Sequence, residues 1–346
     1  MAATAAALVA AAETRTQRYV ATIQAAKALS TTSLAPLASE LPPFRHLTGK
    51  VRDVYLLADD RVLLVSTDRQ SAFDRALAAV PFKGRVLTLT SAWWFERTRH
   101  IVANHVLSVP HASALLCAKC TVFPVEFVVR GYITGTTSTS MWTNYCNGSR
   151  SFCGHVLPEG YVQHQQLPAN LVTPTTKDEH DELISGKEIV QSGRMTQAQW
   201  TFCEEKALAL FAFGQAQAAT RGLILVDTKY EFGVQETTGE ILLIDEIHTP
   251  DSSRYWLADT YDACMAAGKS PDNIDKEFLR LWFKEHCDPY HDAVLPEAPK
   301  ELVTELARRY IMLYELITGA EFVFPPEGSK PEDEFVEGVR KALLAK

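Results

Sequence analysis

Hydrophobic and polar residues alternate along several segments in the first half of the chain. "KVRDVYLL" and "RVLLVSTD" each alternate with the two-residue period of a strand, and the short link at residues 58–60 predicts a turn between them. "CTVFPVEFVVRGYI" is rich in β-branched and aromatic residues and is interrupted at Gly131 and Gly135. From Thr88 the pattern becomes helical. Residues 146–176, rich in glycine, proline and polar groups, predict a long loop.

Two amphipathic helices are predicted in the second half of the chain. Thr196 and Gln199 form the pattern of a capping box, and Gly222 suits the end of the helix that follows. Pro299 and Gly319 bracket "KELVTELARRYIMLYELIT", in which apolar residues recur at helical spacing. Both helices are therefore predicted from local signals alone.

Charged residues interrupt an apolar strand between these two helices. In "LILVDTKYEFG" the side chains of Leu223, Leu225, Asp227, Lys229 and Glu231 share one face, with successive members roughly 7 Å apart. An ordinary solvated edge with surface ion pairs is the alternative interpretation. Because an unpaired charge is costly beside leucines, the pattern favours a functional site.

A turn at "TTG" predicts how this strand pairs with the next one. A three-residue loop with Gly239 in the left-handed conformation places Glu231 opposite Asp245 and turns Glu246 to the other face. A two-residue turn would place Glu231 opposite Glu246, but the usual Asn-Gly or Asp-Gly pair is missing. In the first register two carboxylates converge beside Lys229, which predicts a Mg²⁺ site completed by substrate phosphates.

Further polar residues follow strands or turns elsewhere. Lys50 and Arg52 come after a glycine in "GKVRDVY" and suit a phosphate chain. A second group in "STDRQSAFD" suits either a substrate or the start of a helix: Asp68, Ser71 and Asp74. Arg130 lies at a strand end, where its planar guanidinium suits a phosphate or carboxylate. Other candidates are Lys177, His180 and Asp181 in "TTKDEHDELIS" and Arg254 in "TPDSSRYW".

Composition narrows the classes of partner and compartment. A net charge of −8 and a pI of about 5.7 argue against nucleic acid as the main partner. No apolar run approaches the ~20 residues of a membrane span. Seven scattered cysteines favour a reducing compartment such as the cytoplasm. Residues 1–40 are rich in alanine and threonine and favour an extension, with organellar targeting left open. The pattern leaves open a monomer or a homo-oligomer.

Taken in order, the motifs resemble those of the SAICAR synthetases, the phosphoribosylaminoimidazole-succinocarboxamide synthases. The matching segments are "GKVRDVY", "TDRQSAFD", "PVEFVVRGYITG", "TKDEHDELIS", "DTKYEFG", "IDEIHTPDSSRYW" and "DKEFLRLW". The resemblance implies a ligase of purine synthesis that joins L-aspartate to carboxyaminoimidazole ribonucleotide (CAIR). It also implies that ATP becomes ADP and phosphate through an acyl phosphate, with Mg²⁺ as cofactor.

The same resemblance implies a role for each candidate residue. Lys50 and Arg52 would cover the ATP phosphates, with Glu231 and Asp245 holding magnesium beside them. Asp227 and Lys229 would lie at the reacting groups, with Asp227 as the candidate general base. Asp68, Ser71 and Asp74 would lie along the nucleotide substrate, Arg130 and Arg254 at its phosphate, and Lys177, His180 and Asp181 around the aspartate pocket. In "GTTSTSMW" either Thr136 or Ser138 would supply a substrate-binding hydroxyl.

The resemblance also implies an α+β fold. Its N-terminal lobe would be kinase-like, its central lobe ATP-grasp-like and its C-terminal region helical. We place the boundaries at 1–40 for the extension, 41–125 and 126–256 for the two lobes, and 257–346 for the helical region. A small-molecule kinase with the same ATP–magnesium site is the rival enzyme, and a nucleotide-binding regulatory module is the rival that catalyses nothing.

Overall fold

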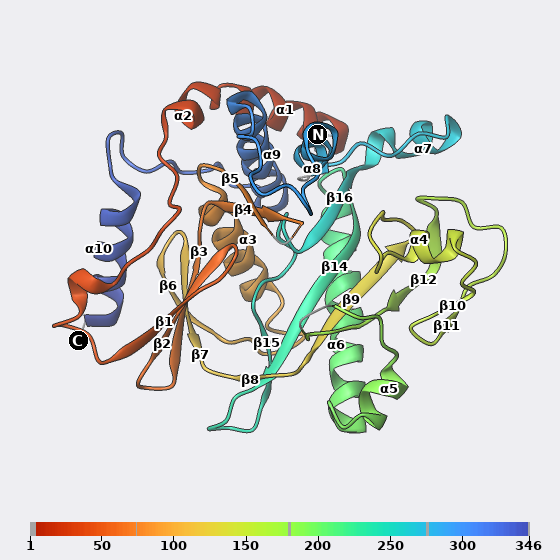
Figure 1. Cartoon of the computed structure of the whole chain (residues 1–346), viewed down its shortest axis with the longest axis horizontal. Coiled ribbons are helices and arrows are strands. Elements are labelled where there is room, and N and C mark those ends of the chain that lie inside the picture. The colour runs from red at the N-terminus through yellow and green to blue at the C-terminus, as the bar shows by residue number, and fades with distance from the viewer. Residues whose placement is uncertain (1–4, 74, 179–180, 275–276, 345–346) are drawn as a thin grey trace.

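The computed structural model describes residues 5–73, 75–178, 181–274 and 277–344. It is a mixed assembly of helices and mostly antiparallel sheets, which confirms the predicted α+β class. In Figure 1 one sheet lies on the left and a second on the right, with helices across the top. Among the described residues, no helix combines the length and the apolar character needed to cross a bilayer.

The first sheet has the strand order β1-β2-β3-β7-β6. Its strands are β1 (Phe44–Thr48), β2 (Arg52–Leu57), β3 (Arg61–Ser66), β6 (Val106–His111) and β7 (Ala114–Ala118). The two strands predicted around residues 58–60 are β2 and β3. The side chains of Tyr55, Leu63 and Val65 are buried on one face, where Phe335 of α10 (Pro331–Leu344) packs against them. Alternation in the sequence therefore fixes which face of this sheet is covered.

The second sheet has the order β12-β9-β14-β15, with β8, β13 and β16 pairing beside this path. Its long strands are β9 (Val125–Tyr132), β12 (Gln166–Val172) and β14 (Leu223–Val234), and its short ones are β8 (Thr121–Val122), β13 (Thr175–Thr176), β15 (Ile241–Ile244) and β16 (Ser253–Leu257). Two small hairpins complete the strands: β4 (Arg69–Ala72) with β5 (Arg75–Ala79), and β10 (Ser151–Phe152) with β11 (His155–Val156). The central strand β14 pairs with four others and carries the predicted acids.

The prediction of a long loop at residues 146–176 is wrong, because this segment contributes four strands, β10 to β13. β12 includes Pro168 and Asn170, which are rare in strands. It is held by pairing with β9 and by the Asn170 side chain, which donates to Gln215 of the long helix α6 (Gln197–Ala219) at 2.8 Å. Tertiary contacts therefore outweigh the local composition here.

The predicted helices are present with their expected ends. Thr196 and Gln199 form the capping box of α6, and Gly319 ends α9 (Lys300–Thr318) with a φ of 72°. The helical pattern expected from Thr88 begins earlier, in α3 (Lys83–Arg97). The other helices are α1 (Ala5–Gln17), α2 (Val20–Ala25), the 3-10 turn η1 (Ala35–Leu37), α4 (Met141–Cys146), α5 (Gly186–Gln191), α7 (Ala258–Ala266) and α8 (Glu277–His286).

The N-terminal extension contains α1 and α2, which lie along α9 (Figure 1). Arg15 Nε lies 2.7 Å from Oε2 of the buried Glu315, and Tyr19 donates to the other oxygen of that carboxylate at 3.0 Å. Glu13 forms an ion pair with the buried Arg308, with its Oε1 atom 2.9 Å from Nη2. The extension is therefore tied to α9 by charged groups as well as by packing. The proposed boundaries between lobes stay a prediction.

The two sheets meet at β15. His105 N–H donates to the Leu243 carbonyl at 3.2 Å, and Leu243 N–H donates to the Ala103 carbonyl at 2.9 Å. These bonds hold the end of the β14–β15 hairpin against the segment that leads into β6. The acids after β15 therefore lie beside the loop before β2.

Candidate active site

The predicted pairing of the β14–β15 hairpin is wrong. Glu231 lies opposite Ile244, and Val234 and Ile241 close a loop of residues 235–240. Gln235 N–H also bonds to the Glu240 carbonyl at 2.9 Å, so four residues, 236–239, turn the chain, more than in either predicted turn. Gly239 does adopt the left-handed conformation that was predicted for it, with a φ of 71°. The turn sequence thus identified the special backbone position but not the length of the loop.

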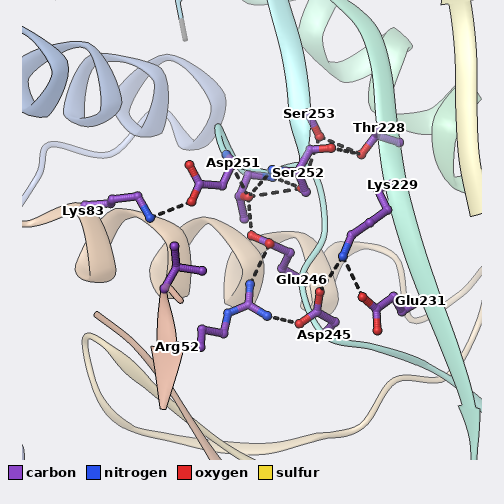
Figure 2. A network of polar contacts seen from close by, with 12 residues as sticks. Arg52, Lys83, Thr228, Lys229, Glu231, Asp245, Glu246, Asp251, Ser252 and Ser253 are labelled. Carbon is purple, nitrogen blue, oxygen red and sulfur yellow. Dashed lines mark hydrogen bonds and ion pairs between the residues drawn. The ribbon is translucent and has the colours of Figure 1, made fainter. Parts of the chain in front are cut away.

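The two predicted carboxylates nevertheless converge on Lys229 (Figure 2). The Nζ atom of Lys229 lies 2.6 Å from Oε1 of Glu231 and 3.2 Å from Oδ2 of Asp245. Asp245 follows the last residue of β15 and has a φ of 68°, so the chain departs from strand geometry at this residue. Lys177 forms an ion pair with the other oxygen of Glu231. The convergence is therefore produced by a local left-handed residue rather than by strand register.

The charges in this cluster stabilise each other. Burial raises the pKa of Glu231. The nearby charges of Lys229 and Lys177 lower it by a larger amount, so that the pKa is about 2. Burial lowers the pKa of Lys229, and the charges of Glu231, Glu126 and Glu246 outweigh this effect, so the net pKa is raised. Glu231 is thus ionised and Lys229 protonated at neutral pH.

Arg52 joins this cluster from the first sheet. Its guanidinium forms ion pairs with Asp245 and with Glu246, the latter at 2.7 Å between Nη2 and Oε1. The expectation that Glu246 faces away from the site is wrong, because the left-handed Asp245 breaks the alternation and lets both acids face Arg52 (Figure 2). Thr249 fixes the other oxygen of Glu246 by a hydrogen bond of 2.5 Å.

The loop that carries Lys50 and Arg52 is held in a tight conformation. Gly49 N–H donates to the Arg52 carbonyl at 2.7 Å. A Cβ atom on Gly49 would lie 2.8 Å from that same oxygen, closer than ordinary contacts allow. A glycine is therefore required at this position by the close approach of the backbone.

A second group of charges lies further along β14. Asp227 lies opposite Arg130 of β9 on one side and Arg254 of β16 on the other. Its Oδ2 atom is 3.8 Å from Nη1 of Arg130 and 3.5 Å from Nη1 of Arg254. That oxygen is buried and accepts no hydrogen bond from the described residues. The register of three strands thus places an acceptor between two guanidinium groups.

The Arg130 side chain is buried and fixed by two threonines. Its Nε donates to Thr173 Oγ1 at 2.9 Å, and its Nη2 donates to the Thr139 carbonyl at 3.2 Å. Thr136 and Ser138, the two alternative hydroxyl donors, are both exposed in the same loop. The loop therefore reaches Arg130 through the backbone of Thr139, and the choice between the two hydroxyls stays open.

The remaining predicted residues lie in different places. Lys177 belongs to the acid cluster, whereas Asp181 is exposed. Ser71 lies in β4, so the alternative of a helix starting there is wrong. Asp74 and His180 lie outside the described residues. Of the predicted aspartate pocket, the described residues thus place Lys177 in direct contact with the acids.

Asp68 lies apart from the acid cluster. Its two carboxylate oxygens accept the backbone N–H groups of Leu29 at 2.7 Å and of Gly84, in the first turn of α3, at 2.8 Å. Burial raises its pKa to about 6. It also lines a cavity of about 640 Å³, together with Arg85 and His111, to which none of the acids around Lys229 contributes. The observed role of Asp68 is to join the N-terminal segment to α3.

Several residues of the site were not predicted. Glu126 Oε1 lies 3.5 Å from Lys229 Nζ, and a signal for it existed, because it shares a strand face with Arg130. Lys83 is fully buried and lies 2.6 Å from Oδ2 of Asp251, whose other oxygen accepts from Tyr310 at 2.7 Å (Figure 2). No local pattern in the sequence predicted the contact between Lys83 and Asp251. It fixes the turn that precedes Arg254 to α3 and α9.

Comparison with known proteins agrees with this geometry. A family model described as SAICAR synthetase matches residues 45–296. The chloroplastic phosphoribosylaminoimidazole-succinocarboxamide synthase of Arabidopsis thaliana is 56% identical over 299 residues, covering 86% of this chain and 72% of the relative. The synthase of Legionella pneumophila (strain Paris) is 54% identical over 306 residues, covering 88% of this chain and 97% of the relative.

Solved structures give the same result. The SAICAR synthase of Saccharomyces cerevisiae complexed with SAICAR has a TM-score of 0.73 at 31% identity and covers 86% of this chain and 100% of its own. A SAICAR synthetase in complex with ADP has a TM-score of 0.61 at 26% identity and covers 81% of this chain and 100% of its own. The likeness therefore extends over both sheets and not only over the quoted motifs.

Proposed function

Because the chain belongs to the SAICAR synthetase family, it is an ADP-forming carbon–nitrogen ligase of purine biosynthesis, and we propose that the charged groups around Lys229 carry out its phosphoryl transfer. The observation that carries this proposal is the position of Lys229 between Glu231 and Asp245, with Arg52 on the far side of Asp245. Transfer of a phosphoryl group needs positioned cations and acids more than a covalent nucleophile.

The carboxylates Glu231 and Asp245 suit magnesium bound together with a nucleotide. Within the described ranges, no group of three or more histidine, cysteine or acidic side chains could hold a metal alone. Mg²⁺ commonly takes one or two carboxylates and completes its shell with phosphate oxygens and water. Bound in this way, the ion would neutralise charge on the transferring phosphoryl group. Lys229 and Arg52 already contact the same carboxylates and would share their charge with the phosphates.

We assign the group around Asp227 to the carboxylated ribonucleotide and to aspartate. Arg130 and Arg254 bring two guanidinium groups to the Asp227 carboxylate, which suits a phosphate or a carboxylate of the substrate. The Oδ2 atom of Asp227, which accepts no hydrogen bond from the described residues, can accept a proton from an amine. L-aspartate supplies that amine in the proposed reaction.

The proposed reaction has two steps. First, an oxygen of the CAIR carboxylate attacks the γ-phosphorus of ATP, ADP leaves, and an acyl phosphate forms. Second, the amine of aspartate attacks the acyl carbon, its proton passes to Asp227, and inorganic phosphate leaves with the oxygen that had bridged it to that carbon. Lys229 and Arg52 hold the phosphates in line during the first step, and Asp227 acts in the second.

ADP release with each substrate omitted in turn tests this proposal. We expect continuous ADP release only when ATP, CAIR and L-aspartate are all present, because the acyl phosphate must be consumed by the amine before the site can turn over again. Full-rate release without aspartate would favour the small-molecule kinase instead. ATP binding without turnover under all conditions would favour a regulatory module.

The cytoplasm remains the proposed location of this chain. All seven cysteines are free thiols, as suits a reducing compartment. The printed name of the Arabidopsis relative assigns that protein to the chloroplast. Imaging of the full chain with a tag at its C-terminus distinguishes the two locations.

A further inference from the structure

The side chain of Arg69 lies against the backbone of residues 49–52, the loop proposed to cover the ATP phosphates. Its Nη2 donates to the Gly49 carbonyl at 2.9 Å, and its Nε donates to the Lys50 carbonyl at 3.3 Å. Thr67 holds the next carbonyl, that of Val51, through its N–H at 3.0 Å and its hydroxyl at 2.7 Å. Three successive carbonyls of the loop are thus bonded to residues 67–69.

These bonds set the direction of the loop. All described peptide bonds are trans, and in a trans peptide the N–H points opposite to the C=O. With the carbonyls of Gly49 and Lys50 turned toward Arg69, the N–H groups of the following residues point away from it. The contacts of Arg69 therefore fix the orientation of the peptide groups between Gly49 and Arg52.

The same guanidinium is bound by the N-terminal segment, here residues 29–32. The Ser30 carbonyl accepts from Nη1 of Arg69 at 2.6 Å. Asp53 Oδ1 lies 2.7 Å from Nη2, and its Oδ2 accepts from the Thr32 hydroxyl at 2.6 Å. Asp53 is only 1% exposed, so this ion pair is shielded from water.

A third contact fixes the segment next to Arg69. Leu29 and Asp68 are joined by two hydrogen bonds, Asp68 N–H to the Leu29 carbonyl at 2.9 Å and Leu29 N–H to the Asp68 carboxylate at 2.7 Å. The N-terminal segment therefore cannot shift without moving the residue that holds the loop.

We infer that Arg69 is a positioning residue for the proposed phosphate loop and that Ser30 and Thr32 hold it in place through direct contact and through Asp53. The inference rests on the proposed function of residues 49–52 in binding ATP. Arginine suits this position because its planar fork supplies several donors in fixed directions, whereas lysine supplies one mobile ammonium. Residues 29–32 thus help to shape the proposed ATP site, although they precede residues 45–296, the part of the chain that the family model matches.

The test compares Arg69→Lys with Arg61→Lys in the full chain. Arg61 lies on the neighbouring strand β3 and forms an ion pair with Asp59 at the surface, so its replacement controls for the general effect of the change. For Arg69→Lys we expect the KM for ATP to rise about tenfold or more, with the KM values for CAIR and aspartate within about twofold. An equal rise in all three constants would overturn the inference.

A second pair of variants tests the N-terminal contact and does not depend on the folding of Arg69→Lys. Thr32→Val removes the hydrogen bond to Asp53 at nearly constant volume, and Thr32→Ser restores the hydroxyl. We expect Thr32→Val to raise the KM for ATP and Thr32→Ser to bring it back toward the original value. A lower melting temperature with unchanged KM for ATP in Thr32→Val would show that the contact is only structural.

Arg52→Gln separates failure of this inference from failure of the proposed function. If Arg52→Gln raises the KM for ATP while Arg69→Lys and Thr32→Val do not, the loop binds ATP but Arg69 does not position it. If Arg52→Gln also leaves the KM for ATP unchanged, the assignment of the loop itself is wrong.

Discussion

Arg52 and Glu246 form an ion pair of 2.7 Å although one belongs to the first sheet and the other follows the last strand of the β14–β15 hairpin. The same guanidinium contacts Asp245, so two consecutive acids bind one arginine. This contact links the two sheets at the proposed phosphate site. We therefore expect substitutions of Arg52 and of the two acids to affect the same step, the proposed phosphoryl transfer.

Asp245→Asn is expected to weaken binding of the metal–nucleotide and to lower kcat, by roughly 10²-fold as for other losses of charge compensation. The fold should survive, because asparagine nearly preserves the shape, and Glu246 and Glu231 still pair with Arg52 and Lys229. A magnesium titration of ADP release measures both effects. Raised Mg²⁺ should restore binding in part but not the full kcat.

Glu246→Gln is expected to be damaging as well, because it weakens the pairing with Arg52. We expect a fall in kcat/KM for ATP of about tenfold, the loss typical of one charge-assisted hydrogen bond. Glu240→Gln, at an exposed position in the hairpin loop, is the matched control. Equal kinetics for the two variants would show that Glu246 takes no part in the site.

Arg130→Lys should weaken binding of CAIR more than binding of ATP. Lysine retains the charge but cannot bond to Thr173 and to the Thr139 carbonyl while still facing Asp227. Separate KM values for the two substrates test this expectation. Arg150→Lys is the control, since Arg150 pairs with Glu159 at the surface. A similar change in both KM values of Arg130→Lys would contradict the assignment.

The lowered pKa of Glu231 predicts how stability depends on pH. Its folded pKa of about 2 lies below the usual value of 4.5, so its contribution is present above about pH 4.5 and is lost as the pH falls toward 2. Lys177→Met removes one of the charges that lower this pKa. The loss of stability on acidification should therefore be smaller in that variant and end at a higher pH, as followed by thermal unfolding between pH 2 and pH 6. Superimposable profiles would show that Lys177 does not stabilise the Glu231 anion.

Arg15→Met should destabilise the fold without altering substrate constants. It removes the cation from the buried Glu315, and we expect a loss of roughly 1–2 kcal/mol, since Arg15 is partly exposed and its ion pair is partly screened. Arg18→Met, at an exposed position in the same segment, is the control. Urea unfolding of both variants measures the difference, and equal midpoints would contradict the prediction.

Local signals in the sequence predicted the elements whose ends depend on local chemistry. The ends of α9 follow from Pro299 and Gly319, and the start of α6 follows from its capping box, because each of these signals acts within one helical turn. The charged face of β14 follows in the same way from strict alternation. The family motifs then indicated which of these charges belong to one site.

The remaining features depend on contacts between distant segments. The convergence of Glu231 and Asp245 could not be obtained from "TTG", because it depends on the left-handed conformation of Asp245, just after β15 meets the first sheet. Asp68 looked like a residue of a helix start or a substrate site, yet its partners are Leu29 and Gly84. No local pattern in the sequence indicates these two partners, because the packing of whole helices and strands determines which residues meet.

The pairing of α1 with α9 bears on how the chain is completed during synthesis. Arg15 and Glu315 are separated by 300 residues, so α1 leaves the ribosome long before the helix that covers it. Until α9 has emerged, the apolar side of α1, with Val9 and Ala12, lacks the cover that α9 gives it. Contacts of such long range form slowly because a large loop must close first. A ribosome stalled before residue 318 would therefore hold a nascent chain that contains the acids of the site but in which α9 does not yet cover α1.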